Sequence, residues 1–253
     1  MSLISVKNVT MKFGGLTAVD HVTLQIKAHD ICGLIGPNGA GKTTLFNVIA
    51  GYYKPSEGTI HFQDHRIDGL HPYQVNNLGI ARTYQNINLF RSMTVLENIM
   101  VGRHPRLSAG IAGSVFRTPS QRKEEQELRD KSMEILRMVG LQHKAGETSR
   151  NLSYGEQRRL EICRGIASDP KLLLLDEPAA GMNTKEKLEL VEFIRKIRDF
   201  GITVLVVEHD MKVVMGLTEY VFVLNFGKLI AEGQPADIQT NPEVIKAYLG
   251  EDV

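Results

Sequence analysis

The sequence predicts an α/β fold with a mostly parallel sheet, an N-terminal antiparallel β layer and a helical insert. Residues 171–175 and 202–207 are short, almost wholly apolar runs, and Lys185–Phe200 between them has the apolar spacing of a helix. Buried parallel strands that alternate with helices produce this pattern. Residues 2–35 and about 83–150 do not share it, and they predict the β layer and the insert respectively.

The N-terminal region has the period of two that half-buried strands show. Apolar and polar residues alternate along 2–35, for example at Ile4, Val6 and Val9, and they alternate again over Gly58–Phe62. We therefore expect the strands of a largely antiparallel layer here.

The middle of the chain predicts a helical subdomain. Strand signals fade after about residue 83, and Gln121–Val139 is a charged segment with helically spaced apolar residues. The stretch 102–121 carries several Pro and Gly residues and predicts a long exposed loop. We expect one domain over residues 1–253, with a core that includes the β layer (1–84 plus 151–253) and a helical subdomain (85–150).

A glycine-rich loop identifies the core as that of a P-loop nucleoside triphosphatase. The pattern G-x-x-x-x-G-K-[ST] is matched in full, directly after the apolar run 31–35 and before an amphipathic helical stretch. Its glycines let backbone N–H groups surround phosphate oxygens, Lys42 adds a cation and Thr43 offers a hydroxyl to Mg²⁺. A chance Gly-rich turn is the alternative. The phosphate loop comprises Gly36, Pro37, Asn38, Gly39, Ala40, Gly41, Lys42, Thr43 and Thr44.

Acidic and histidine side chains follow two of the other predicted strands. Asp176 and Glu177 end the run of leucines, and His209 lies just beyond Val207. Parallel strands place their carboxyl ends at one edge of a sheet, so these groups are expected to converge with the loop. There Asp176 would hold the Mg²⁺ shell, Glu177 would act as general base and His209 would contact the γ-phosphate or orient the attacking water. The alternatives are a helix N-cap, a surface carboxylate and an ordinary histidine.

Composition narrows the function classes. Thirty basic residues against twenty-nine acidic ones leave a formal charge of +1, which gives no general electrostatic reason to bind nucleic acid. The two cysteines, Cys32 and Cys163, lack metal-ligand spacing, and a reducing compartment fits them best. No stretch approaches the roughly 20 apolar residues that span a bilayer, and the start of the chain lacks a signal-peptide core. We therefore expect any membrane role to go through a partner.

One further motif names a family. Ser153, Tyr154, Gly155 and Glu156 precede a basic helical stretch, and they fit a capping box as well as an anion site. With Phe13, the phosphate loop, Gln85, Asp176-Glu177 and His209 in this order, the chain resembles the nucleotide-binding subunits of ATP-binding-cassette (ABC) transporters along nearly its whole length.

The resemblance implies the ABC ATPase fold, ATP and Mg²⁺ as ligands, and further roles. Phe13 would stack on adenine, and Gln85 would contact Mg²⁺ and sense the γ-phosphate. Ser153 and Gly155 would contact the ATP held by a second ATP-binding subunit, in a homodimer or a homologous heterodimer. The partners would be integral membrane permease subunits at the cytoplasmic face of the membrane and, indirectly, a substrate-binding protein. Nucleic acid is not expected as a partner.

Local sequence also indicates a subfamily. Residues 177–183, 208–212 and 247–250 and the insert around 114–119 look like the ATPase of branched-chain amino-acid importers, and the ATPase of a lipopolysaccharide exporter is the related alternative. Tyr154 and Asn183 stand where glycine and aspartate are usual, which puts coupling between subunits in question. Residues 86–97, including Phe90, are expected to dock on the permeases or to form a buried connector. A soluble ABC protein without transport and a guanosine triphosphatase are the other readings, and the second lacks an Asn-Lys-x-Asp motif.

Overall fold

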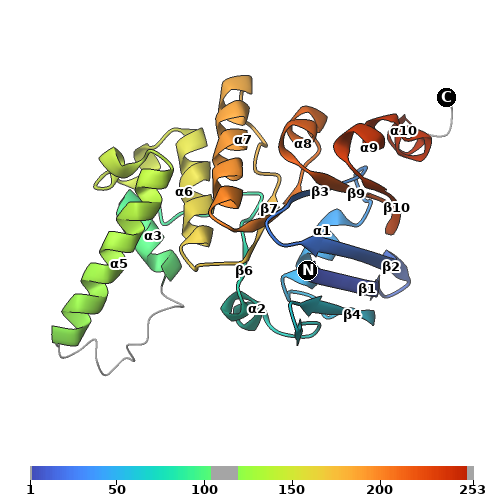
Figure 1. Cartoon of the computed structure of the whole chain (residues 1–253), viewed down its shortest axis with the longest axis horizontal. Helices are drawn as coiled ribbons and strands as arrows, with labels where there is room; N and C mark the ends of the chain where they lie inside the picture. The colour runs from blue at the N-terminus through green and yellow to red at the C-terminus, as the bar shows by residue number, and fades with distance from the viewer. Residues whose placement is uncertain (1, 104–118, 250–253) are drawn as a thin grey trace. The chain divides into compact units, whose positions relative to one another are not determined.

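The computed structural model describes residues 2–103 and 119–249 (Figure 1). The strands are β1 (Ser2–Phe13), β2 (Leu16–Lys27), β3 (Ile31–Ile35), β4 (Glu57–Phe62), β5 (His65–Arg66), β6 (Ile80–Arg82), β7 (Leu172–Asp176), β8 (Thr203–Val207), β9 (Tyr220–Asn225) and β10 (Lys228–Gly233). The helices are α1 (Lys42–Ile49), α2 (Pro72–Leu78), α3 (Val95–Arg103), α5 (Pro119–Met138), α6 (Tyr154–Ile166), α7 (Thr184–Asp199), α8 (Met211–Leu217), α9 (Pro235–Thr240) and α10 (Pro242–Leu249).

The chain divides into two compact units, Met1–Gln85 with Lys171–Val253, and Asn86–Pro170. The predicted subdomain boundary at residue 150 lies 20 residues before the end of the second unit, because α6 packs on α3 within that unit. The compact units therefore do not coincide with the predicted subdomain 85–150, which stays a prediction.

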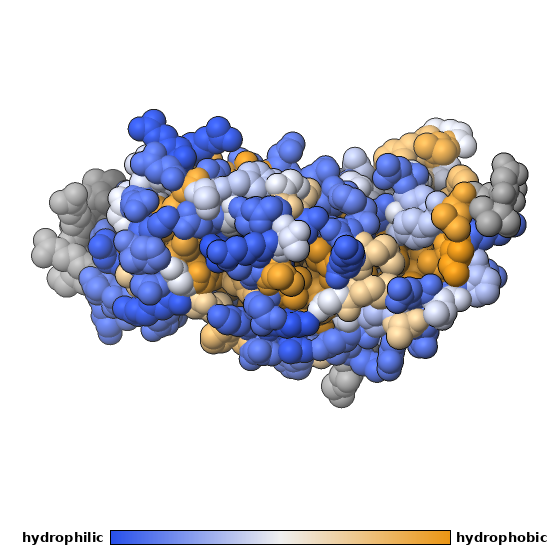
Figure 2. Space-filling model, turned by 90° about the horizontal axis from the view of Figure 1, so that it is seen from above, coloured by the Kyte–Doolittle hydropathy of each residue, from blue (hydrophilic) through white to orange (hydrophobic). Residues whose placement is uncertain are grey.

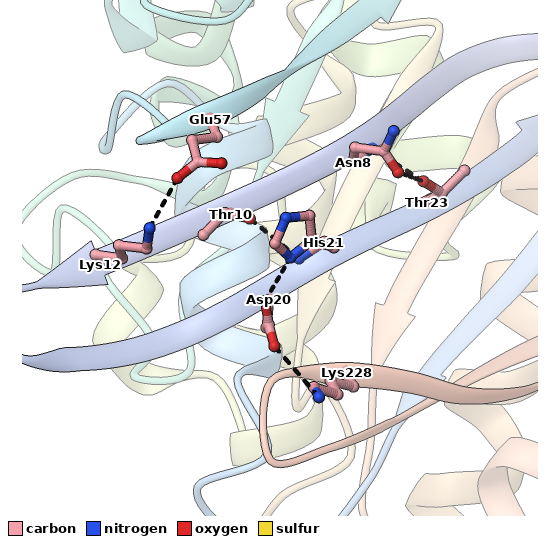
Figure 3. Close-up of polar contacts among 8 residues, drawn as sticks. All are labelled: Asn8, Thr10, Lys12, Asp20, His21, Thr23, Glu57 and Lys228. Carbon is pink, nitrogen blue, oxygen red and sulfur yellow. Dashed lines mark hydrogen bonds and ion pairs between the residues drawn. The ribbon is translucent and has the colours of Figure 1, made fainter.

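The N-terminal β layer of the first unit is a four-stranded antiparallel sheet in the order β2-β1-β4-β5. Side chains on its open face reinforce the pairing (Figure 3): Lys12 Nζ lies 2.7 Å from Glu57 Oε1, and Thr23 donates a hydrogen bond to Asn8. Lys228, at the start of β10, forms an ion pair with Asp20 on β2. The predicted antiparallel layer is confirmed.

The second sheet of this unit has six strands in the order β10-β9-β3-β8-β7-β6. All its pairings are parallel except that of β10 with β9. Every residue of β3, β7 and β8 is buried, as their almost wholly apolar sequences predict. The predicted parallel core is thus confirmed, with β8 lying between β3 and β7.

Helix α1 lies between the two sheets, and α7 and α8 lie on the opposite face of the six-stranded sheet (Figure 1). Phe46 and Leu45 of α1 are fully buried in a cluster with residues of both sheets. On the other face, Ile35 of β3 packs with Val214 of α8 and Val244 of α10. The phosphate loop therefore joins a strand and a helix that are both anchored in the core.

The second unit contains α3, α5 and α6. The buried pair Arg158–Glu161 (2.8 Å) lies on α6, and Glu161 also accepts a hydrogen bond from the backbone N–H of Asn88. Asn98 of α3 holds Phe90 through both backbone groups, accepting from its N–H and donating to its carbonyl. Segment 86–94 is thus irregular in path but fixed by side chains of the helices in its own unit.

The predicted limits of the middle loop were wrong. Residues 102–103 belong to α3 and 119–121 to α5, because their helical periods continue into the Pro- and Gly-containing stretch. The rest of the predicted 102–121 loop and nearly all of the 114–119 insert lie outside the described residues, as does Gly250. Within the described part, no helix is long and apolar enough to span a bilayer, and hydrophilic residues predominate on the face shown in Figure 2.

Candidate functional site

The phosphate loop connects β3 to α1 in a conformation that two of its glycines make possible. Gly36 has φ +148° and Gly41 has φ +99°. A Cβ atom would lie 2.1 Å from the carbonyl oxygen of Leu224 at Gly36, and 2.4 Å from that of Ala18 at Gly41. Backbone of β9 and β2 therefore presses against the loop, which excludes any side chain at these two positions.

Lys42 begins α1 and turns its ammonium group back over the loop. Its Nζ donates hydrogen bonds to the carbonyl oxygens of Gly36 (2.7 Å) and Pro37 (2.9 Å). Burial lowers the pKa of Lys42, and the nearby carboxylates of Glu177 and Asp176 oppose that shift. A buried ammonium with two acidic neighbours and a glycine-rich loop is suited to bind polyphosphate.

The outer side of the loop meets the C-terminal helix of the same unit. Pro37–Ala40 line a cavity of about 640 Å³ together with residues of the β9–β10 turn and α10. The hydroxyl of Tyr248 on α10 forms a hydrogen bond with the backbone of Gly36. Burial raises the pKa of Tyr248, and this hydrogen bond partly offsets that rise. Helix α10 therefore contacts the phosphate loop and helps to hold it in place.

Asp176 ends β7 with a nearly buried side chain. Its Oδ2 lies 3.0 Å from Nη2 of Arg82 on the neighbouring strand β6, and the two side chains are 9% and 10% exposed. The next helix along the chain, α7, is capped by Asn183 and not by Asp176, so the N-cap alternative for Asp176 is wrong. Arg82 also donates to Asn47 of α1, and sequence reasoning missed both of these residues.

Gln85, Glu177 and His209 come together at the end of the same sheet. Gln85 Nε2 donates to Glu177 Oε2 at 2.8 Å, and His209 Nδ1 lies 3.6 Å from the same oxygen. Glu177 adopts φ +44°, a costly conformation for a residue with a side chain, and its N–H bonds the carbonyl of Val207 on β8. With Asp176 they form the strand-end cluster, which the parallel topology predicts.

Two carboxylates just after β8 contact the segment that follows Glu177: one binds the loop and the other binds helix α7 beyond it. Glu208 is 1% exposed, and its Oε1 accepts a 2.8 Å hydrogen bond from the N–H of Ala179. Burial raises the pKa of Glu208. Asp210 caps α8 and pairs with Lys187 of α7 at 2.6 Å. Sequence reasoning noted Glu208 only as a neighbour of His209 and gave it no role.

Asn183, read from sequence as a departure at a coupling position, has a local structural role. It is the N-cap of α7: its side chain accepts from the N–H of Glu186, and Glu186 accepts from the N–H of Asn183, both at 3.0 Å. This capping box could have been read from the Asn-x-x-Glu spacing.

Phe13 lies at the end of β1 with its ring partly exposed. It makes an edge-to-face contact with Tyr53, with ring centroids 5.3 Å apart. Tyr53 follows α1 by four residues, and sequence reasoning did not single it out. Two partly exposed rings at this place offer an aromatic surface for a planar base.

Ser153 and Gly155 lie in the second unit, at the start of α6. Ser153 is the N-cap, with its hydroxyl accepting from the N–H of Glu156, and Glu156 Oε2 accepts from the N–H of Ser153 at 3.0 Å. Lys144 Nζ holds the other oxygen of Glu156 at 2.7 Å. The capping box is therefore present, while the side chain of Tyr154 is partly exposed.

Comparison with known proteins decides the family. Residues 19–180 match the family model described as ABC transporter, and residues 228–253 match the one described as branched-chain amino acid ATP-binding cassette transporter. The high-affinity branched-chain amino acid transport ATP-binding protein LivG of Escherichia coli K12 is 47% identical over 250 residues, which covers 98% of each chain. The chain belongs to the ATP-binding subunits of branched-chain amino-acid ABC transporters.

Solved structures of ABC cassettes share the fold. The ADP conformation of MJ1267, an ATP-binding cassette of an ABC transporter, superimposes with a TM-score of 0.87 at 31% identity, over 99% of this chain and 100% of that one. The dimeric post-hydrolysis state of the cassette MJ0796, bound to ADP and Pi, gives a TM-score of 0.75 at 27% identity, over 92% and 98%. The predicted ABC ATPase fold and the ATPase subunit of an ABC transporter are confirmed.

The residues expected to hold Mg²⁺ all lie in the first unit, and their chemistry can be compared with what the ion prefers. Among residues 2–103 and 119–249, no three His, Cys, Asp or Glu side chains gather as a metal centre. Thr43, Gln85 and Asp176 offer a hydroxyl, an amide and one carboxylate. This oxygen donor set fits Mg²⁺, which usually keeps waters and shares substrate phosphates rather than filling a cage of protein ligands.

Proposed function

We propose that this chain binds Mg-ATP and hydrolyses it to drive the import of branched-chain amino acids through membrane permease subunits. The observation that carries the proposal is the contact of Gln85 and His209 with the carboxylate of Glu177, at the end of the sheet that bears a complete phosphate loop. The match of residues 228–253 supports the substrate class.

In this proposal the phosphate loop binds the triphosphate, with backbone N–H groups of its non-proline residues and the ammonium of Lys42 against the phosphate oxygens. Thr43, Gln85 and Asp176 would hold Mg²⁺, and Phe13 would stack on adenine. Bound Mg²⁺ neutralises charge that develops on the phosphate oxygens. The residues of this chain contribute by holding the reacting groups in position.

Glu177 is the proposed general base. Its carboxylate takes a proton from the attacking water, whose oxygen forms the new bond to the γ-phosphorus as the bond to the leaving ADP oxygen breaks. Gln85 and His209 each lie against Glu177 Oε2, so both limit where this oxygen points. His209, with a side chain 60% exposed, is free to face the γ-phosphate.

Ser153 and Gly155 complete the site of a second ATP-binding subunit in this proposal. The start of α6 presents the positive end of the helix dipole and a serine hydroxyl, both of which suit phosphate oxygens. The related cassette MJ0796 is described as dimeric with ADP and Pi bound, which supports such an arrangement.

The test is Glu177→Gln, which keeps the size and the contact to Gln85 but removes the base. We expect ATP affinity within about threefold of the parent, hydrolysis slower by about 10²-fold or more, and an ATP-dependent dimer on gel filtration. Glu192→Gln, the same change on the exposed face of α7, should leave all three unchanged. Parental turnover in Glu177→Gln would remove Glu177 from the role of base.

We further propose that residues 86–97 dock on the permease subunits at the cytoplasmic face of the membrane. Phe90 is 45% exposed although Asn98 holds its backbone, so an apolar ring is presented on a fixed segment. Phe90→Glu should abolish leucine uptake by reconstituted transporter vesicles while ATP affinity stays parental. Leu188→Glu, a charge at another exposed apolar position, is the control. Normal uptake with Phe90→Glu would exclude this docking surface.

A further inference from the structure

Arg82 makes several polar and aromatic contacts beside the strand-end cluster, and no motif described above includes it. It projects from the three-residue strand β6, which lies beside β7 at the edge of the parallel sheet. Its side chain is only 10% exposed, and three aromatic rings, one carboxylate and one amide surround the guanidinium. Such a buried cation is costly unless every contact contributes.

The charged contacts of Arg82 connect two motif-bearing elements. Nη2 lies 3.0 Å from Oδ2 of Asp176, the last residue of β7, and Nη1 donates to Oδ1 of Asn47 on α1, the helix that starts with Lys42. The planar guanidinium with its fixed fork of N–H groups can hold both acceptors at once. One oxygen of Asp176 is therefore fixed in direction by Arg82.

The aromatic contacts connect Arg82 to a third element. The guanidinium carbon lies 5.5 Å from the ring centre of Tyr52, 5.6 Å from that of Tyr84 and 5.9 Å from that of Phe46, all within the range of cation–π attraction. The hydroxyls of Tyr52 and Tyr84 hydrogen-bond each other. Tyr84 immediately precedes Gln85, whose amide holds Glu177, so the cage around Arg82 also fixes the backbone that delivers Gln85.

We propose that Arg82 is a positioning residue for ATP hydrolysis: it holds Asp176, α1 and the Tyr84–Gln85 segment in one arrangement. The proposal rests on the function proposed above, because it assumes that Asp176 and Gln85 serve bound Mg-ATP. Arg82 itself touches neither nucleotide nor metal in this scheme. Its effect is on where Asp176 Oδ1 and the Gln85 amide point.

The test uses Arg82→Gln and Arg82→Lys in the full-length chain, with Arg66→Gln as the control. The control variant removes the same guanidinium group, but the Arg66 side chain is 62% exposed in its ion pair with Asp68. For Arg82→Gln we expect a KM for ATP within about threefold of the parent, a kcat lower by about tenfold or more, and a half-saturating Mg²⁺ concentration raised about fivefold or more. Arg82→Lys keeps the charge but not the fork, and should lose less on each measure. Arg66→Gln should match the parent.

A second measurement separates positioning from a general structural role. Hydrogen exchange of the chain without nucleotide should be faster in Arg82→Gln for a peptide containing residues 83–85, while a peptide containing 31–35 exchanges at the parental rate. The double variant Arg82→Gln/Asp176→Asn should lose little more kcat than Asp176→Asn alone, since both changes remove one coupled unit.

The outcomes distinguish the two proposals. Unchanged kcat and Mg²⁺ dependence in Arg82→Gln, strictly additive losses in the double variant, or equally faster exchange in both peptides would each overturn the positioning role. If Arg82→Gln does not fold, Arg82→Lys decides the question, and parental kcat and Mg²⁺ dependence in that variant overturn it. If instead Asp176→Asn keeps parental kcat and Mg²⁺ dependence, the proposed metal role of Asp176 fails.

Discussion

Two of the regions predicted to act on ATP are built in opposite ways. In the first unit, the strand-end cluster gathers side chains from the ends of β6, β7 and β8, up to 124 residues apart in the chain. In the second unit, Ser153, Gly155 and Glu156 are near neighbours at one helix start, where Ser153 and Glu156 cap each other's backbone N–H groups. One region is held by tertiary structure and the other by local capping.

The difference predicts how each region responds to mutation. A change in the strand-end cluster removes a contact made by another element, so the neighbouring side chains of the cluster should lose their orientation while α1, β7 and β8 remain folded. A change at Ser153 removes the cap of α6 as well as the proposed phosphate contact, so function and local stability should fall together. The predictions below ask whether tertiary contacts or local caps decide the effect of a change.

The largest effect is expected for Lys42→Ala. It removes the cation of the phosphate loop and the two hydrogen bonds to Gly36 and Pro37. We expect ATP affinity to fall by about 100-fold or more, since charged hydrogen bonds contribute about 1.5–3 kcal/mol each. Isothermal titration calorimetry with ATP measures this directly. Affinity within a few-fold of the parent would contradict the assignment of the loop.

Ser153→Ala should affect stability and turnover but not the affinity of the isolated chain for ATP. Loss of the N-cap costs about 1 kcal/mol of unfolding free energy, measurable by urea denaturation. Turnover should fall about tenfold or more if the hydroxyl serves the ATP of a second subunit. Ser168→Ala, which removes a hydroxyl bonded to Gly165 on the same helix, is the control. Weaker ATP binding by monomeric Ser153→Ala would contradict the shared site.

Sequence predicted the cluster well because its residues end strongly patterned strands. Asp176, Glu177 and His209 follow apolar runs whose parallel pairing brings their ends together. Arg82 could not be predicted in this way: it lies on a strand of three residues, and its partner Asp176 is 94 positions away. Pairing across that distance depends on strand order, which periodicity alone does not contain.

Glu208 was missed for a related reason. Its position after β8 is visible in the sequence, but its burial depends on the loop from Pro178 to Asn183 folding over it, which Ala179 anchors. The capping box of Asn183, in contrast, depends only on residues three positions apart, Asn183 and Glu186. A local rule would have found it.

Glu208→Gln changes a buried acid of the first unit, and Glu161→Gln changes a buried acid of the second unit. Burial raises the pKa of both carboxyls, but Glu161 pairs with the buried Arg158, whereas Glu208 accepts from backbone N–H groups. A raised folded-state pKa contributes stability that is fully present below the unfolded pKa of about 4.3 and is lost as pH rises through the folded pKa.

We therefore expect Glu208→Gln to gain unfolding free energy relative to the parent as pH rises from about 4 to about 8. Glu161→Gln should instead lose about 3 kcal/mol or more at neutral pH, because Arg158 keeps its charge in the interior. Urea denaturation at several pH values measures both. A Glu208→Gln difference that stays constant with pH would show that this carboxyl does not titrate with folding.

The smallest effect is expected for Asn183→Asp, which restores the residue usual in the family. Aspartate caps a helix as well as asparagine does, and its charge favours the start of α7, while Glu186 in the same capping box repels it. The two charge effects oppose each other, so unfolding free energy should stay within about 0.5 kcal/mol of the parent, whereas Asn183→Ala should cost about 1 kcal/mol. Urea denaturation compares the three chains. A loss in Asn183→Asp as large as in Asn183→Ala would mean that repulsion by Glu186 outweighs the cap.

If Asn183→Asp keeps the parental stability, any change in transport per ATP hydrolysed would come from the charge itself. Position 183 would then belong functionally with the strand-end cluster rather than with a self-contained cap.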